Sequence, residues 1–242
     1  MSDQIRNSIE FRVWGRYALF TDPLTKIGGE KCSYYVPTYE ALKGIAKSIY
    51  WKPTLIWVID EVRVMKRIRT QTKGTKPLQY GGGNTLAIYT FLADIEYQVR
   101  AHFEWNVYRT ELRNDRVEGK HYAIAKRMLE RGGRQDIFLG TRDCQAYVEP
   151  IEFGSGTGAL DNAGELAFGL MFHGFDYPDE TGDGKLHARF WWSTMVDGVI
   201  RFARPEDCPV RKCIRKMSVK SFGVGQNLCA AEDEPAEAGE LE

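Results

Sequence analysis

The chain has 242 residues, of which 43% are hydrophobic and 27% charged, the balance of a globular protein that buries a sizeable core. Its longest apolar run, residues 54–59, is too short to cross a bilayer, and residues 1–10 lack the apolar stretch of a secretion signal. This composition excludes membrane-spanning and fibrous proteins, so we expect no membrane partner and a cytoplasmic location.

The zero formal net charge hides an uneven distribution of charged residues. Residues 221–242 carry six acidic side chains and neither Lys nor Arg, which leaves an excess of six positive charges on the rest of the chain. Acidic ends that also contain Pro and Gly are typically disordered. We therefore predict a disordered acidic tail over 221–242 and a mildly basic body that suits an anionic partner.

The cysteines and carboxylates do not form the patterns that bind metals. The five cysteines are odd in number and include no CxxC pair, which argues against a zinc site and a disulfide framework. The carboxylates are not clustered as in two-metal nucleases. The sequence thus predicts no metal site and no cofactor, and any phosphate chemistry would proceed without a metal ion.

The first elements follow from periodicity and turn residues. Near-alternation over residues 5–14 predicts a strand. After a loop rich in Gly and Pro, a helix is predicted to open at residues 37–38 and to end near 50–51, because Pro53 bars its continuation. Its apolar residues fall on one face and are Tyr39, Leu42, Ile45, Ala46 and Ile49.

Strands are predicted over 54–64, 85–91 and 95–106, which are rich in β-branched and aromatic residues. The intervening basic stretch contains three consecutive glycines and is interpreted as a hairpin that protrudes from the sheet. Its basic side chains suit the backbone of a nucleic acid, although an ordinary solvated face is the alternative. These candidates for RNA contact are Arg63, Lys66, Arg67, Arg69, Lys73 and Lys76.

A second helix is predicted from Tyr122 to a Gly-Gly stop at 132–133, followed by a strand over 144–153. The order strand, helix, strand, strand, helix, strand is that of the split βαβ, or ferredoxin-like, arrangement, which is also RRM-like. Strand-like runs and Asp-Gly turns then predict a small antiparallel sheet. We therefore predict an α+β protein with a ferredoxin-like domain over 1–155, a small β subdomain over 156–220 and the acidic tail.

This arrangement places chemistry between the two helices. Helices on one face of a ferredoxin-like sheet are antiparallel, so Tyr50 would lie near Lys120 and His121, about seventy positions later. The N-terminus of a helix attracts phosphate, and an imidazole transfers protons near neutral pH. Each residue also has an ordinary alternative: a core tyrosine, a solvated lysine, and a surface or capping histidine.

Several stretches of the sequence together resemble one known family. They are RYALFTDPLTKIGGEKCSYYVPTYEALKGIAKSIYWKPT, YGGGNTLAIYT, EGKHY, GGRQDIFLGTRDCQAYV, FGSGTG, HGFDYPDETG and RPEDCP. With these motifs, residues from about 5 to 210 resemble the type I-C (Dvulg) form of the fifth CRISPR-associated protein family, within the RAMP superfamily of RNA-processing proteins.

The resemblance implies a metal-independent endoribonuclease that cuts CRISPR repeat RNA at the base of its stem-loop. It also implies that the protein retains the 5′ handle within a surveillance complex of type I-C Cas subunits. The catalytic tyrosine, lysine and histidine of the family fall on Tyr50, Lys120 and His121. Two alternatives remain, a non-catalytic subunit that caps the 5′ handle and a subunit that binds duplex DNA.

Overall fold

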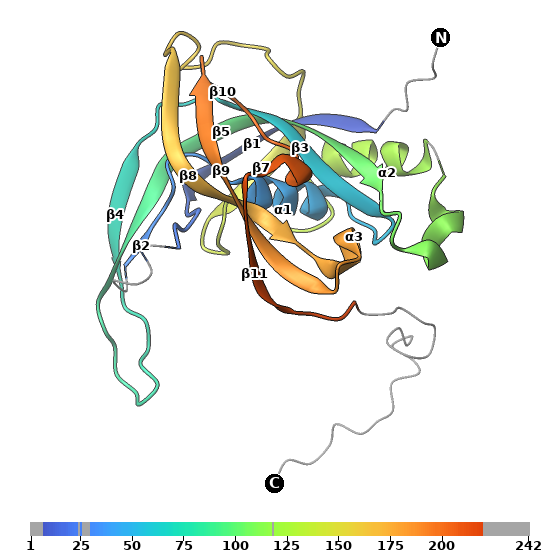
Figure 1. Ribbon diagram of the computed structural model, residues 1–242. Coiled ribbons are helices and arrows are strands. Elements are labelled where there is room, and N and C mark those ends of the chain that lie inside the picture. Colours follow the sequence, from blue (N-terminus) through green and yellow to red (C-terminus); the bar gives the residue numbers. More distant parts are fainter. Residues whose placement is uncertain (1–6, 24, 26–29, 118, 220–242) are drawn as a thin grey trace.

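The computed structural model describes residues 7–219 except residues 24, 26–29 and 118 (Figure 1). The acidic tail predicted over 221–242 lies outside the described residues. The elements in chain order are β1 (Ser8–Ala18), β2 (Lys31–Cys32), α1 (Tyr39–Ile49), β3 (Leu55–Val64), β4 (Thr70–Thr75), β5 (Ala87–Trp105), the 3-10 helix η2 (Thr110–Asp115), α2 (Lys120–Glu130), β6 (Ile137–Phe138), β7 (Gln145–Pro150), β8 (Glu165–Asp176), α3 (Pro178–Thr181), β9 (Lys185–Val196), β10 (Val199–Arg201), the 3-10 helix η3 (Pro205–Asp207) and β11 (Val210–Lys216).

One mostly antiparallel sheet joins the strands of the described chain, in the order β11-β9-β10-β3-β5-β1-β7-β6. Strands β2 and β4 also pair with β5, and β8 pairs with β9; the β2–β5 pair is the parallel exception among these. Helix α1 lies in the chain between β2 and β3 and packs against β3, and α2 lies between η2 and β6 and packs against β7 and β1. The prediction of an α+β fold is confirmed at this level.

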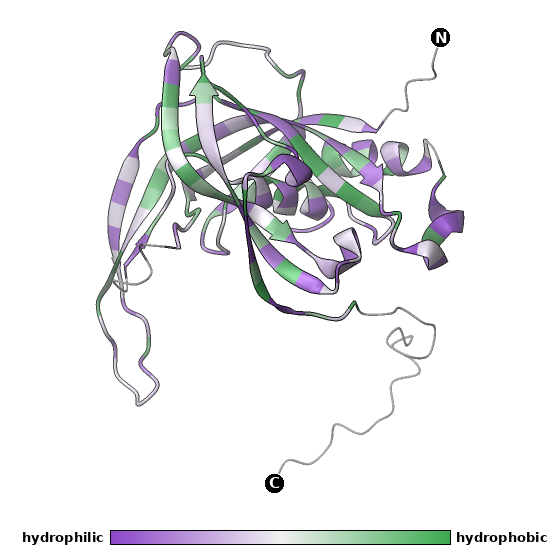
Figure 2. Ribbon diagram, viewed as in Figure 1, coloured by the Kyte–Doolittle hydropathy of each residue, from purple (hydrophilic) through white to green (hydrophobic). Residues whose placement is uncertain are grey.

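The sequence of α1 explains its place in the core. Thr38 precedes the helix, and its hydroxyl accepts a hydrogen bond from the backbone N–H of Ala41 at 3.2 Å, which caps the first turn. The apolar face predicted for this helix is buried in full, and Figure 2 shows that polar and apolar residues alternate along the strands nearby. The cap thus fixes where α1 begins, and burial of the apolar face fixes which side of the helix lies against the sheet.

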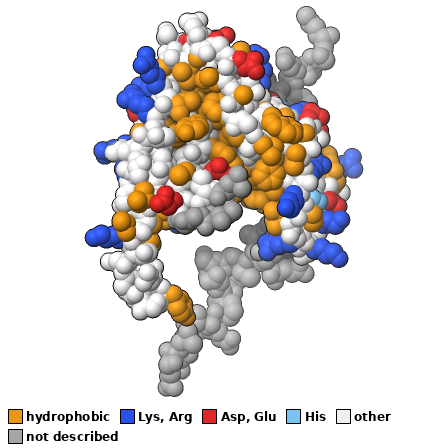
Figure 3. Space-filling view, turned by 60° about the vertical axis from the view of Figure 1, so that its left-hand side comes forward, with side chains coloured by type: hydrophobic (Ala, Val, Ile, Leu, Met, Phe, Trp, Pro, Cys, Tyr) orange, Lys and Arg blue, Asp and Glu red, His pale blue; other side chains and the backbone are white. Residues whose placement is uncertain are grey.

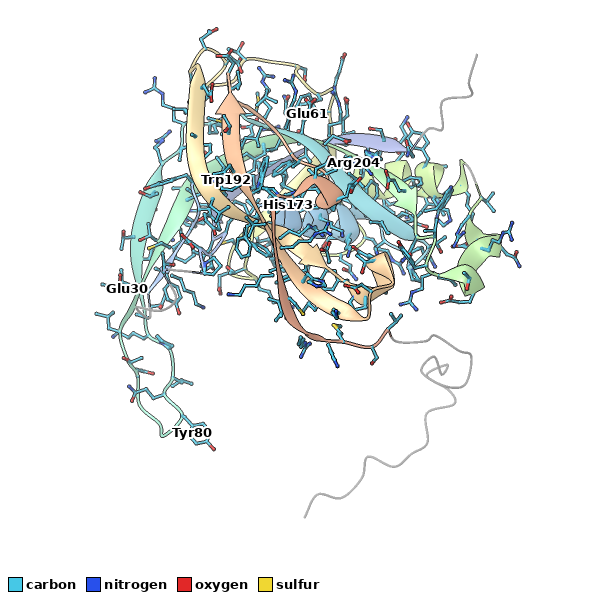
Figure 4. The ribbon with its side chains drawn as sticks, in the orientation of Figure 1. Glu30, Glu61, Tyr80, His173, Trp192 and Arg204 are labelled. Atoms are coloured by element: carbon cyan, nitrogen blue, oxygen red, sulfur yellow. The ribbon has the colours of Figure 1, made fainter. Side chains whose placement is uncertain are left out.

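Strand β5 is longer than the sequence suggests. Two separate strands were predicted over 85–91 and 95–106, but residues 87–105 form one strand with a kink at Asp94, where φ is +57°. Its first part pairs with β4 to form the predicted hairpin, which projects from the body with Tyr80 at its tip (Figures 1 and 4). Strand β1 stays paired with β5 on both sides of Asp94, so the sheet is not interrupted at the kink.

The C-terminal strands continue the same sheet, because β10 pairs with β3 from Val199 opposite Arg63 to Arg201 opposite Glu61. They enclose His173, which is labelled in Figure 4. Its ring stacks on Tyr39 with centroids 4.1 Å apart, and its Nε2 lies 2.9 Å from the carbonyl oxygen of Ala203. Burial lowers the pKa of His173 to about 3, so this histidine stays neutral and structural.

No helix of the described chain has the length and apolarity needed to cross a membrane.

Gly140 marks a place where two backbone segments touch. Its φ is +94°, and a Cβ there would lie 2.7 Å from the carbonyl carbon of Leu19 and closer still to its oxygen. We expect Gly140→Ala to lower the free energy of unfolding by about 3 kcal/mol, from backbone strain and overlap combined. Gly44→Ala is the matched control, because a Cβ on this exposed helical glycine meets nothing within 4 Å.

The control should stabilise the protein by about 1 kcal/mol, since alanine is the better helix former. Thermal denaturation of the two variants measures both changes. Equal melting temperatures for Gly140→Ala and the unchanged protein would contradict the close approach of residues 19 and 140.

Candidate active site

Tyr50 and His121 meet where α1 ends and α2 begins. The hydroxyl of Tyr50 lies 2.9 Å from Nδ1 of His121, although 71 positions separate the two residues in the chain. Tyr50 is the C-cap of α1, and His121 belongs to the first turn of α2. The predicted approach of these two helix ends is therefore present in the structure.

The imidazole of His121 is held on both of its nitrogens. Nε2 lies 2.7 Å from the backbone oxygen of Asp115, which can only accept a hydrogen bond, so Nε2 carries a proton. In the neutral ring Nδ1 then accepts from the hydroxyl of Tyr50. The ring of Trp105 adds an edge contact, with centroids 5.5 Å apart. His121 is 0% exposed and Tyr50 2%, so neither group faces open solvent.

Lys120 lies beside this pair but is exposed to solvent. Its Nζ donates to Oδ1 of Asp115 at 2.7 Å. The other carboxylate oxygen of Asp115 accepts from Thr54 at 2.8 Å and lies 3.4 Å from Nε2 of His121. Asp115 thus links the ammonium, the imidazole and the residue that precedes β3.

Burial and charge shift the two acids of this site in opposite directions. Burial raises the pKa of Tyr50, and the negative charge of Asp115 raises it further, against the opposing charge of Arg134. Burial alone would also raise the pKa of Asp115, but the hydrogen bonds from Lys120 and Thr54 and the neighbouring His121 outweigh it and hold that pKa below its usual value. At neutral pH the site therefore contains a protonated phenol beside a carboxylate.

The start of α2 leaves donors for an anion. Its N-cap is Gly119, with φ +76°, which offers no side-chain oxygen to the first backbone N–H groups, and the described residues of the first turn include no acid. Uncapped N–H groups and the helix dipole favour a phosphate at such an end. Lys120 and the backbone of this turn can therefore stabilise negative charge next to His121.

The basic candidates divide into two groups. Lys66, Arg67, Arg69 and Lys76 are exposed on the hairpin or its base, and Lys73 lies over the ring of Tyr17, 3.3 Å from its centroid. Figure 1 shows β4 and α2 at opposite ends of the molecule, so these cations lie away from the start of α2, where His121 is. Figure 3 shows Lys and Arg at the margins of the hairpin side and hydrophobic side chains across its middle.

Arg63 differs from the other RNA-contact candidates because its side chain is buried. It is 7% exposed, and its NH2 group lies 2.7 Å from the carboxylate of Asp161. Further hydrogen bonds reach Gln98 and the backbone oxygens of Ser155 and Gly156. Its guanidinium joins β3 to the loop before β8. Arg63 lies within β3 with its side chain buried, whereas the other basic candidates follow the end of this strand. Arg63 thus has internal partners, and its contact with RNA stays a prediction.

Three residues that sequence reasoning did not assign to the site belong to it by position. Asp115 and Thr54 form the hydrogen-bonded support described above, and the charge of Arg134 acts on Tyr50. Asp115 stands five residues before Lys120, but only the path of the loop turns its backbone oxygen toward His121.

Within the described residues, no three His, Cys, Asp or Glu side chains are grouped to hold a metal ion.

Comparison with known proteins places this arrangement in a family. The family model Cas_Cas5d, described as CRISPR-associated protein (Cas_Cas5), matches residues 8–203. The CRISPR pre-crRNA endoribonuclease Cas5d of Mannheimia succiniciproducens is 46% identical over 222 residues, covering 80% of this chain and 94% of that protein. The protein of the same name from Thermus thermophilus is 27% identical over 175 residues, covering 68% and 73%.

A solved structure agrees with this assignment. The crystal structure of a CRISPR-associated protein superimposes with a TM-score of 0.70 at 33% identity and covers 85% of this chain and 96% of its own. The match to the family model extends from β1 to the residues that follow β10, and so includes every residue of the candidate site. The chain belongs to the Cas5d family of CRISPR-associated proteins.

Proposed function

We propose that this protein is a CRISPR pre-crRNA endoribonuclease that cuts repeat RNA at the base of its stem-loop without a metal ion. The observation that carries the proposal is the 2.9 Å contact between Tyr50 and His121 at the uncapped start of α2, beside Lys120. Two relatives named CRISPR pre-crRNA endoribonuclease Cas5d support the choice of substrate.

RNA supplies its own nucleophile in the 2′-hydroxyl of the nucleotide before the cut. The protein must remove that proton, align the oxygen with phosphorus, stabilise the additional negative charge and protonate the leaving 5′-oxygen. We assign proton transfer to His121 and charge stabilisation to Lys120 with the first N–H groups of α2. The products are then a 2′,3′-cyclic phosphate and a 5′-hydroxyl.

The direct bond to His121 favours an orienting role for Tyr50 over a separate acid. A tyrosine hydroxyl both donates and accepts, so it can hold either tautomer of the imidazole at Nδ1. If Nδ1–H donates to Tyr50, Nε2 is left as a base. Tyr50 would thereby keep the ring in one orientation while Nε2 takes the proton of the 2′-hydroxyl and gives it to the leaving 5′-oxygen.

Access to His121 requires the segment that carries Asp115 to move, because the backbone oxygen of Asp115 occupies Nε2. The 3-10 helix η2 that ends at Asp115 has no buried residue, so little apolar contact opposes its displacement. A phosphate at the start of α2 would replace the carboxylate of Asp115 as the partner of Lys120. Substrate binding and site opening are thus one event in this proposal.

The rest of the chain has complementary roles in the same proposal. The central strand order β3-β5-β1-β7, with α1 and α2 as crossovers, supports a ferredoxin-like domain over 1–155, followed by the β subdomain over 156–220. The exposed cations of the β4–β5 hairpin would contact the RNA backbone, and the protein would keep the 5′ handle as a subunit with other type I-C Cas proteins. Duplex DNA is a further anionic partner that the same cations would accept.

The test is incubation of the purified full chain with its cognate repeat RNA in excess EDTA. We expect a single cut at the base of the stem, and end analysis should identify a 2′,3′-cyclic phosphate. The chemistry needs an imidazole, an ammonium and the 2′-hydroxyl of the RNA, so chelation should leave the rate unchanged. Cleavage that stops in EDTA and returns with Mg²⁺ would contradict the mechanism, and no cleavage in either buffer would contradict the function.

A further inference from the structure

An open groove of about 810 Å³ lies beside the candidate active site. Its lining includes Trp51 and Pro53, which follow α1, Leu112 of η2, and Arg134, whose backbone N–H bonds to the end of α1. Thr54 and Asp115 also line it, and they are the hydrogen-bonded pair that supports Lys120 and His121. A ligand in this groove would therefore lie directly against the support of the catalytic candidates.

The groove is basic. Lys47, Lys52 and Arg134 line it, and Lys47 is paired with Glu180 at 3.1 Å, so Lys52 and Arg134 are the cations that face a ligand. Asp115 is the acid among the described lining residues and is already bonded to Lys120. The carbonyl oxygens at the end of α1 add little negative charge, because those of Ser48 and Ile49 accept hydrogen bonds from the backbone N–H groups that follow Gly133. The positive electrostatic potential of the groove therefore suits the negative charge of a phosphodiester.

The groove also presents an aromatic surface. Trp51 is 38% exposed, although its neighbour Tyr50 is 2% exposed, so the indole turns outward where the phenol turns inward. Leu112 and Pro53 provide further apolar contact across the opening. An exposed indole flanked by cations is the combination on which proteins stack a base while they hold its phosphate.

We propose that this groove binds one unpaired nucleotide next to the scissile phosphate, with its base stacked on Trp51 and its phosphate held by Arg134 and Lys52. The inference rests on the proposed function and adds the part of the substrate that the site selects. Inside a stem both faces of a base are covered by neighbouring base pairs, so only a base at or beyond the end of the stem can offer its face to the indole. Trp51 would therefore place the cut at the junction between the stem and the single strand.

The experiment uses the full chain and a repeat RNA with 2′-deoxyribose at the cut position, which prevents cleavage. 2-Aminopurine replaces each unpaired base beside the stem in turn, and its fluorescence reports stacking. We expect quenching at one position on binding to the unchanged protein and to Trp51→Phe. Trp51→Ala should lose that quenching and bind the RNA at least about tenfold more weakly, the loss of one stacked base.

Trp192→Ala is the matched control, since Trp192 is 60% exposed on β9 and does not line the groove. It should bind and quench as the unchanged protein does. The proposal is overturned if Trp51→Ala binds and quenches normally, which is also the result expected if Trp51 docks a protein subunit instead. A folded Trp51→Phe that fails to quench would equally overturn it.

Failure of the proposed function gives a different result. Quenching that depends on Trp51, from a protein that never cleaves unmodified RNA, would keep the groove and reject the nuclease. Cleavage with normal affinity in Trp51→Ala would keep the nuclease and reject the groove. With unmodified RNA under single turnover, Trp51→Ala should raise the RNA concentration that gives half-maximal rate more than it lowers the maximal rate.

Discussion

Replacing His121 with alanine should reduce single-turnover cleavage of repeat RNA by about a thousandfold, the usual contribution of a positioned acid or base. Binding of the RNA should not weaken, because the variant lacks the bond between His121 and the backbone oxygen of Asp115 that the substrate otherwise has to break. The measurement pairs a cleavage time course with a binding titration on uncleavable RNA. This separation of cutting from binding distinguishes a nuclease from a subunit that only caps the 5′ handle.

Two further variants protect this result from a folding defect. His121→Gln retains a hydrogen-bonding side chain opposite Asp115 but cannot exchange protons near neutral pH, so it should be as inactive as the alanine variant. His187→Ala, on β9, should cleave normally and serves as the histidine control. Full activity in a folded His121→Ala protein would contradict the catalytic role of His121, whereas binding without cleavage by the unchanged protein would support the capping alternative.

A single 2′-deoxyribose at the nucleotide before the cut should abolish cleavage and leave affinity within about twofold. The 2′-oxygen is the nucleophile in the proposed mechanism, and its removal leaves the catalytic groups without a reaction to assist. Electrophoresis of the deoxy and unmodified RNA with the same protein measures the effect. Deoxyribose one nucleotide further upstream is the control and should be cut as the unmodified RNA is.

Continued cleavage of the deoxy substrate would show that water is the nucleophile. Such a result would contradict the assigned roles of His121 and Lys120, even if both residues proved essential. It would also predict a linear phosphate end in place of the cyclic one. The two experiments therefore test different parts of the mechanism.

The meeting of Tyr50 with His121 could be predicted from the sequence because it follows from regular elements. Helix periodicity, the stop at Pro53 and the start near Lys120 define where both helices end, and the strand order then brings those ends together. The 2.9 Å contact shows how far such reasoning extends. It depends on helices and strands, whose geometry is known in advance.

Loops and burial set the limit of the same reasoning. The backbone oxygen of Asp115 reaches His121 only because of the path of η2, which has no repeating pattern in the sequence. Arg63 looks like its basic neighbours in the sequence, yet Asp161 and the loop at 155–156 enclose it. Charge counts cannot separate an arginine that joins two segments from one that meets solvent.

The bonds of Asp115 have a consequence for the cell, where most RNA is not a substrate. A protein whose imidazole and ammonium are already engaged internally presents few reactive groups to a passing transcript. Only an RNA whose binding free energy compensates for breaking those bonds would expose His121 and Lys120. Tight binding is then a condition for cleavage. Messenger RNA would not be cut, because the substrate-free enzyme keeps His121 and Lys120 in these bonds. No separate inhibitor would be needed.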